Sequence, residues 1–250
     1  MSRRVIISGN WKMYKTTAEA RELVEGLVEG FSAINDREMV IFPPSIHTKE
    51  IVAMTSDSGI EVGVQNMYFK EEGAFTGEIS PKMVKDAGAT YILIGHSERR
   101  HVFGETDEMI NDKVHAAYSA GLKPMLCIGE LLEEYEAGKS KDVCKQQLVA
   151  DLKGVSADQM KNMVIAYEPV WAIGTGKVAT PEIAESIHAS VREVLKELYS
   201  ESVAETVPVL YGGSVKPDNA AGLLSQNNID GVLVGGACLK ADSFLSIAKS

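Results

Sequence analysis

The 250-residue sequence predicts an α/β fold in which eight parallel strands close into a barrel with outer helices, a (β/α)8 barrel. Short apolar runs rich in β-branched residues recur along the chain. They are continuous rather than alternating, as in parallel strands buried on both faces. Segments of helical periodicity separate them, so that a strand–helix pair recurs about every thirty residues. An open doubly wound sheet is the alternative, but eight pairs favour the closed barrel.

The predicted strands are the apolar runs at residues 5–7, 39–42, 60–64, 91–94, 124–128, 163–167, 207–211 and 231–234. The clearest helix lies between the sixth and seventh runs. Its apolar positions are Ile183, Ile187, Val191, Val194 and Leu198. Thr180 is placed to cap it and Pro181 occupies its first position. Thr16 and Glu19 have the spacing of a capping box, which predicts a helix after the first strand.

Composition predicts one domain over residues 1–250, because no linker or low-complexity segment interrupts the chain. Three cysteines without a CxxC pair favour a reducing compartment. The apolar run near the N-terminus is too short for a signal peptide or membrane span, so we expect an unprocessed, soluble, cytoplasmic protein. The net charge of −10 argues against a nucleic-acid partner, and an anionic substrate would need local positive groups.

Active sites of (β/α)8 barrels lie at the carboxyl ends of the strands, so the residues that follow each apolar run are the candidates. Lys12 follows the first run, and we interpret it either as a fixed positive charge at the barrel mouth or as a surface lysine. His96 follows the fourth run. It caps the next helix or, with its pKa lowered by the helix N-terminus, donates a hydrogen bond as a neutral ring. Ser97 is no hydrolase nucleophile, because Arg99 replaces the glycine that G-x-S-x-G requires.

Glu168 ends the sixth run and is a candidate general base if apolar neighbours raise its pKa. The connection at residues 169–179 begins with a proline and is glycine-rich near its end, which predicts a closing lid. A plain surface loop is the alternative, but it would expose Trp171 and Ile173. Residues 174–179 match G-x-G-x-x-A only weakly as a dinucleotide site, because they lie too far from the strand.

Two glycine pairs follow the last two predicted strands. Gly212 and Gly213 precede Ser214 after the seventh strand, and Gly235 and Gly236 follow the eighth. These loops are neighbours in a barrel, and glycines let backbone N–H groups approach phosphate oxygens closely. Each pair alone is typical of a tight turn, whereas the two together favour a phosphate site.

Residues 9–13, 95–100, 166–177, 211–219 and 231–236 together resemble the triosephosphate isomerase family in order and spacing. The resemblance covers essentially the whole chain and implies the TIM-barrel fold. It also implies the interconversion of dihydroxyacetone phosphate and D-glyceraldehyde 3-phosphate in glycolysis and gluconeogenesis, with neither metal nor cofactor.

The same resemblance implies roles for individual residues. Glu168 would move a proton between C1 and C2, and neutral His96 would polarise the carbonyl. Lys12 would supply positive charge, with Asn10 placing it and binding the substrate. Glu98, near Lys12, would have a supporting role. The residues implied in phosphate binding are Gly174, Ser214, Gly235 and Gly236.

The segment from Gln65 to Glu78 resembles the loop that this family inserts into a partner subunit, which implies a homodimer with Thr76 near the partner's active site. Val178 and Tyr14 depart from the family pattern, which has threonine and asparagine there. We expect neither to change the reaction, although Val178 would alter lid timing. Another phosphosugar barrel is an alternative, but Glu168 stands where an aldolase would have its Schiff-base lysine. A non-catalytic phosphate-binding barrel is the other alternative.

Overall fold

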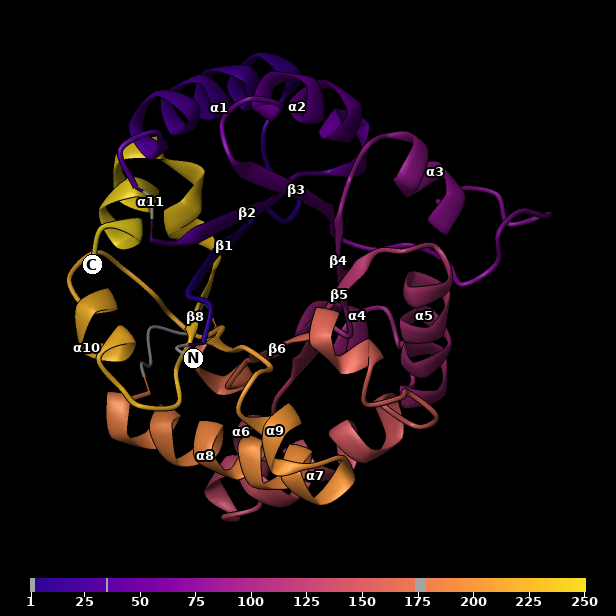
Figure 1. Ribbon diagram of the computed structural model, residues 1–250, viewed down its shortest axis with the longest axis vertical. Helices are drawn as coiled ribbons and strands as arrows, with labels where there is room; N and C mark the ends of the chain where they lie inside the picture. Colours follow the sequence, from indigo (N-terminus) through magenta and orange to yellow (C-terminus); the bar gives the residue numbers. More distant parts are fainter. Residues whose placement is uncertain (1–2, 35, 174–178) are drawn as a thin grey trace.

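The computed structural model describes residues 3–34, 36–173 and 179–250. In these residues, eight parallel strands form a closed barrel in chain order, and β1 (Ile6–Asn10) pairs with β8 (Gly231–Val234) to close it. Helices surround the barrel on the outside (Figure 1). The predicted fold class is therefore confirmed.

The other strands are β2 (Glu38–Phe42), β3 (Ile60–Val64), β4 (Tyr91–Ile94), β5 (Lys123–Ile128), β6 (Val164–Tyr167) and β7 (Val209–Tyr211). The α-helices are α1 (Thr17–Phe31), α2 (Thr48–Thr55), α3 (Pro81–Asp86), α4 (Ser97–His101), α5 (Asp107–Ser119), α6 (Leu132–Glu136), α7 (Ser140–Asp151), α8 (Pro181–Leu198), α9 (Glu201–Ala204), α10 (Ala220–Leu224) and α11 (Ala241–Ala248). Short 3₁₀ helices are η1 (Ser45–His47), η2 (Gln159–Asn162), η3 (Val170–Ala172) and η4 (Gly236–Leu239).

Two strand boundaries differ from the prediction by two residues or more, for clear reasons. β1 continues to Asn10 because it pairs with β2 as far as Asn10 opposite Phe42. β7 begins only at Val209, because Pro208 has no N–H and the N–H of Val207 donates to Val203 at the end of α9. The first change places Asn10 on a rigid strand rather than on the loop beyond it.

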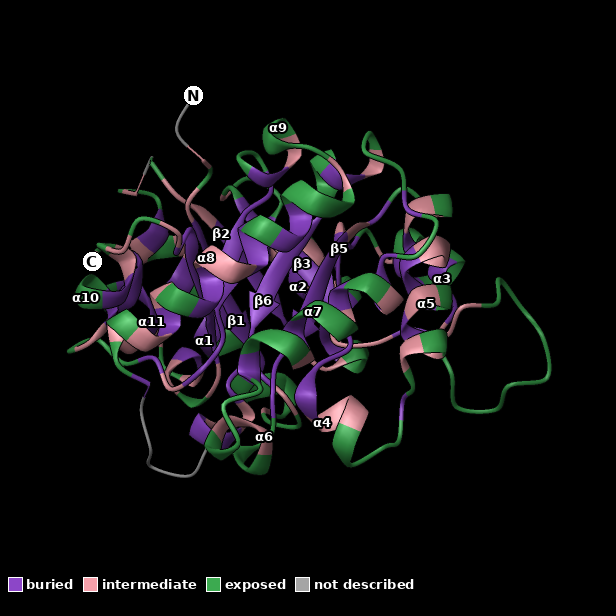
Figure 2. Cartoon of the chain, turned by 90° about the horizontal axis from the view of Figure 1, so that it is seen from below, coloured by how far each residue is buried: buried purple, intermediate pink, exposed green. Residues whose placement is uncertain are grey.

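The strands are mostly apolar because both of their faces are covered. One cluster of side chains fills the barrel interior, and Val40 and Phe42 of β2 belong to it. Their neighbours Met39 and Ile41 point to the opposite face and pack in the larger layer between barrel and helices. Figure 2 shows the strands as buried and the outer helix faces as exposed.

The helix starts follow the predicted capping chemistry. The Thr180 side chain accepts a hydrogen bond from the N–H of Ile183 at the start of α8. Thr16 and Glu19 form the capping box of α1. Each cap satisfies N–H groups that the helix cannot satisfy itself, and thereby fixes where the helix begins after its loop.

The loop between β3 and α3 projects far from the barrel (Figures 1 and 2). Residues 70–78 are all exposed.

Among the described helices, none is long and apolar enough to cross a membrane.

Candidate active site

A cleft of about 500 Å³ lies at the carboxyl ends of the strands. Asn10, Lys12, His96 and Glu168 all line it, together with the loops that follow β7 and β8. The predicted catalytic residues come from positions 10 to 168 in the sequence, and the barrel brings them to one opening. The further described residues of the lining are Tyr14, Ile173, Gly212, Gly213, Ser214, Val215, Lys216, Leu233, Val234, Gly235, Gly236, Ala237 and Leu239.

Glu168 is held in a defined position by two donors. It follows β6 directly, and its side chain is only 3% exposed. Its Oε1 lies 3.1 Å from Nε2 of His96, and its Oε2 accepts a hydrogen bond of 3.0 Å from the N–H of Ser97. Both donors come from the first residues after β4, so the β4 and β6 loops together orient this carboxylate.

The hydrogen bonds of His96 determine which ring nitrogen carries hydrogen. The N–H of Glu98 donates to Nδ1 of His96 at 3.2 Å, so Nδ1 is an acceptor. The hydrogen of a neutral ring then lies on Nε2, which faces Glu168 and the cleft. His96 therefore both caps α4 and presents a donor to the cleft, so the two alternatives predicted for it are not exclusive.

The pKa of His96 differs from the prediction. Burial lowers the pKa of His96, but the Glu168 carboxylate outweighs burial and raises it above its usual value. Burial raises the pKa of Glu168, but His96 and the N–H of Ser97 outweigh burial and lower it below its usual value. The prediction weighed a helix N-terminus for His96 and apolar neighbours for Glu168. It omitted the attraction between these two side chains.

Lys12 is fixed by contacts with three different strands or loops. Its backbone is in the left-handed region, with φ of 53°, and its N–H donates to Oδ1 of Asn10 at 2.9 Å. Nε2 of Gln65 donates to the Lys12 carbonyl at 2.8 Å. The Nζ group lies 2.7 Å from Oε1 of Glu98. A left-handed lysine costs free energy, so these contacts must hold it in that conformation.

The glycine pairs serve different purposes, which the sequence alone did not separate. A Cβ on Gly212 would lie 2.7 Å from Cγ of Glu168, and one on Gly213 would lie 2.1 Å from the Tyr211 hydroxyl. Glycines after β7 therefore make room for neighbouring side chains. A Cβ on Gly235 would meet only Cε of Lys12, at 3.8 Å, and one on Gly236 would meet nothing within 4 Å. The β8 pair therefore faces the open cleft, as a ligand-binding loop requires.

The start of the predicted lid is anchored beneath the surface. Trp171 is 7% exposed, and its indole N–H donates to Oε1 of the fully buried Glu130 at 2.8 Å. The same oxygen accepts hydrogen bonds from Tyr167 and Ser140. Exposure of Trp171 is the argument against a plain surface loop, and because Trp171 is buried here, this argument does not decide between a loop and a lid. Gly174 and Val178 lie outside the described residues.

The remaining predicted residues lie either at the cleft or outside it. Ser214, Gly235 and Gly236, for which phosphate binding is predicted, line the cleft, and Glu98 lies beside it through its contact with Lys12. Thr76 is exposed on the projecting loop and is not part of this chain's own cleft. Tyr14 and Lys216 line the cleft although no role was predicted for them. In the described ranges, no group of three or more His, Cys, Asp or Glu side chains is arranged to hold a metal ion.

Comparison with known proteins agrees with this geometry. The family model for triosephosphate isomerase matches residues 5–250. A triosephosphate isomerase from Acetivibrio thermocellus is 52% identical over 249 residues, covering 100% of this chain and 99% of that protein. Those from Roseiflexus sp. (strain RS-1) and Chloroflexus aurantiacus are each 50% identical, covering 98% and 97% of this chain and 96% and 97% of theirs. The chain belongs to the triosephosphate isomerase family.

Proposed function

We propose that this protein interconverts dihydroxyacetone phosphate and D-glyceraldehyde 3-phosphate, a step of glycolysis and gluconeogenesis. Glu168 takes a proton from one carbon of the substrate and returns it to the next, through an enediolate. The observation that carries the proposal is the arrangement of Glu168, His96 and Lys12 around one cleft.

Glu168 must leave its resting contacts to act as a base. Its carboxylate is occupied by Nε2 of His96 and the N–H of Ser97. When the carboxylate moves towards a bound substrate, it loses the two partners that lower its pKa but stays buried. Burial then raises the pKa, so that the carboxylate becomes a stronger base when it reaches the carbon acid.

His96 and Lys12 stabilise the charge that develops on the substrate oxygens. Once Glu168 moves away, the Nε2 hydrogen of His96 is available to the carbonyl oxygen. Lys12 adds a positive charge, and Asn10 holds its backbone. The backbone N–H groups of Gly235 and Gly236, with Ser214, bind the phosphate that does not react. Gly174 joins this phosphate set by resemblance to the family.

A coupled assay tests this assignment. We expect rapid conversion of D-glyceraldehyde 3-phosphate to dihydroxyacetone phosphate. EDTA is present to bind metal ions, and the isomerase itself is given no nucleotide cofactor. Glu168→Gln should remove nearly all turnover, because the amide cannot accept the proton. Affinity for a non-reacting phosphate analogue should stay within about tenfold of wild type, or roughly 1.4 kcal/mol. Wild-type turnover in that variant would exclude Glu168 as the base.

We also propose that the protein is a homodimer whose projecting loop, residues 65–78, enters the partner near its cleft and brings Thr76 there. Exposed apolar side chains follow four consecutive strands, β1 to β4, at the same end of the barrel as the cleft. They include Met13 at 94% exposed, Ile46 at 84%, Phe75 at 39% and Val102 at 72%. An apolar surface of this kind is typical of a protein interface.

Light scattering of the purified protein tests the dimer. We expect twice the chain mass for wild type, and a shift to the monomer for Phe75→Glu, because a charge would be buried in the interface. Val149→Glu, on α7 and 46% exposed, is the matched control and should leave the mass unchanged. A wild-type monomer with full turnover would contradict the proposal.

A cytoplasmic location is also proposed, since Cys127, Cys144 and Cys238 are buried free thiols.

A further inference from the structure

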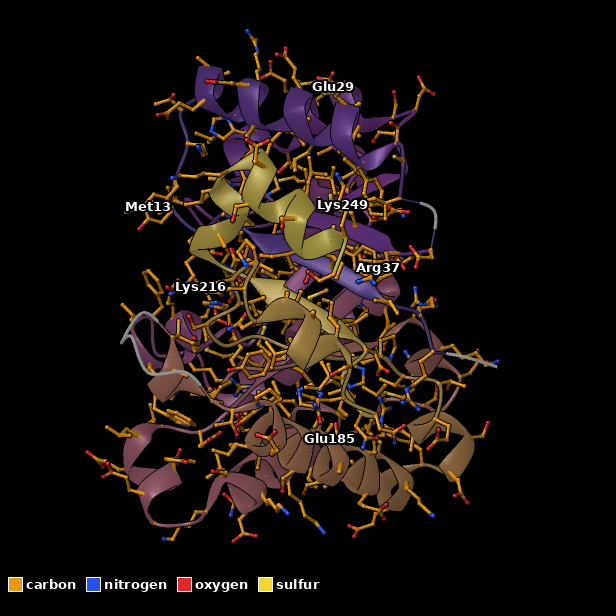
Figure 3. The ribbon with its side chains drawn as sticks, turned by 90° about the vertical axis from the view of Figure 1, so that its left-hand side faces the viewer. Met13, Glu29, Arg37, Glu185, Lys216 and Lys249 are labelled. Carbon is orange, nitrogen blue, oxygen red and sulfur yellow. The ribbon has the colours of Figure 1, made fainter. Side chains whose placement is uncertain are left out.

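Lys216 occupies a position at the mouth of the cleft that the catalytic assignment does not use. It is exposed, follows Ser214 by two residues and lines the cleft. Figure 3 shows it on the same edge of the molecule as Met13, which follows Lys12. Among the described residues, no side chain forms an ion pair with Lys216, whereas Lys12 is paired with Glu98.

The backbone around Lys216 is held in place. Its N–H donates to Oδ1 of Asn219 at 2.8 Å, and Nδ2 of Asn219 donates to the carbonyl of Ser214 at 2.9 Å. These two bonds close the loop onto itself next to the phosphate-binding residues. The side chain of Lys216 therefore starts from a fixed point, while its ammonium group stays in water.

Lys216 makes a large contribution to the net charge of the described residues at the cleft. For a substrate still approaching the cleft, the charges of Lys12 and the adjacent Glu98 carboxylate largely cancel, because their atoms are 2.7 Å apart. Glu168 contributes one negative charge, and Lys216 contributes one positive charge. Without Lys216, these groups would carry a net negative charge when His96 is neutral and no net charge when His96 is protonated, in a chain whose total is already −10. A triose phosphate carries close to two negative charges at neutral pH and would be repelled.

We propose, on the basis of the triose phosphate reaction above, that Lys216 is a capture residue that attracts the substrate dianion to the cleft and takes no part in proton transfer. A unit charge on the order of 10 Å from a dianion changes the local concentration of that dianion about fourfold in water. Salt at 0.1 M removes much of this effect, because the Debye length is then about 10 Å.

The experiment compares Lys216→Gln, Lys216→Arg and Lys216→Glu with wild type over a range of ionic strength. At low ionic strength, kcat/KM should fall about fourfold in Lys216→Gln and by roughly the square of that factor in Lys216→Glu, while Lys216→Arg stays near wild type. The value of kcat should not change. At about 1 M salt the four proteins should converge.

Lys153→Gln is the matched control. Lys153 is exposed and lies between α7 and β6, at the opposite end of the barrel, so this variant changes the net charge equally but away from the cleft. It should show wild-type kcat/KM at every salt concentration. An equal fall in both glutamine variants would mean that overall charge, and not the position of Lys216, attracts the substrate.

Two results would overturn the proposal. One is an unchanged kcat/KM in Lys216→Gln at low salt. The other is a loss that persists at high salt together with a lower kcat, which would mean direct contact with the reacting substrate. Absent turnover in wild type would instead refute the proposed reaction. In that case the affinity for glycerol 3-phosphate, measured by calorimetry, must still follow the same order among the variants and the same salt dependence.

Discussion

Removal of the positive charge of Lys12 tests how the cleft stabilises a negatively charged substrate. We consider Lys12→Met, because methionine has a similar length and the same difficulty as lysine in adopting a φ of 53°. Loss of activity in this variant would therefore report the charge rather than a change in backbone strain. The Asn10 and Gln65 contacts go to backbone atoms of Lys12 and remain available.

The size of the effect follows from where Lys12 lies. Its side chain is 22% exposed, between bulk water and the protein interior. Two unit charges about 4 Å apart at an effective dielectric constant near 20 interact by about 4 kcal/mol. Because the charge on the substrate oxygens grows in the transition state, we expect kcat/KM to fall by about three orders of magnitude.

Glu98 gives this prediction an internal check. Without Lys12, the Glu98 carboxylate, which is 45% exposed, is left without its partner beside the cleft and repels the substrate. The double variant Lys12→Met/Glu98→Gln should therefore recover about fivefold of the lost kcat/KM, since an exposed charge pair at contact is worth about 1 kcal/mol. Steady-state kinetics of the four proteins at fixed ionic strength provide the measurement. A loss below about tenfold in Lys12→Met would refute the electrostatic role, and no recovery in the double variant would refute the account of Glu98.

Two further predictions concern the phosphate loop and the core. Gly236→Ala places a Cβ in open space, so the free energy of unfolding should stay within about 0.5 kcal/mol of wild type while the affinity for a phosphate analogue falls at least tenfold; unchanged affinity in calorimetry would mean that phosphate does not approach Gly236. Burial lowers the pKa of His188 to about 3, below the value near 6.5 expected in the unfolded chain, so its contribution to stability is present above pH 6.5 and is lost as the pH falls towards 3. In urea unfolding, wild type should therefore lose about 2 kcal/mol between pH 6.5 and 5 that His188→Gln does not lose, and equal slopes would contradict this.

The fold could be predicted from the sequence because its signals are local and repeated. Apolar runs buried on both faces appear at a regular spacing, and caps such as Thr180 satisfy the first turn of their own helix. The boundaries of β1 and β7 required knowledge of the neighbours. Asn10 belongs to β1 because Phe42 pairs with it, and Val209 begins β7 because Pro208 cannot donate.

The site residues that could be predicted are those that lie at or just after the end of a strand. Lys12, His96 and Glu168 each come at or just after a strand end and meet in the cleft. What could not be predicted arises between segments distant in sequence. The opposing pKa shifts of His96 and Glu168 depend on a separation of 3.1 Å across 72 positions. The packing role of Gly212 depends on Glu168 beside it. Lys216 gave only the weak signal of a lysine two residues after the Gly-Gly-Ser loop.

The most direct test of Glu168 as a carrier of protons is the reaction in deuterium oxide, followed by NMR. Conversion of unlabelled D-glyceraldehyde 3-phosphate should place deuterium at C1 of dihydroxyacetone phosphate, because a proton held by Glu168 exchanges with solvent before it is returned. Glu168→Gln should abolish both the conversion and the labelling. Rapid conversion in wild type with no deuterium in the product at any time point, together with conversion that survives in Glu168→Gln, would mean that hydrogen passes directly between the two carbons and that Glu168 is not the base.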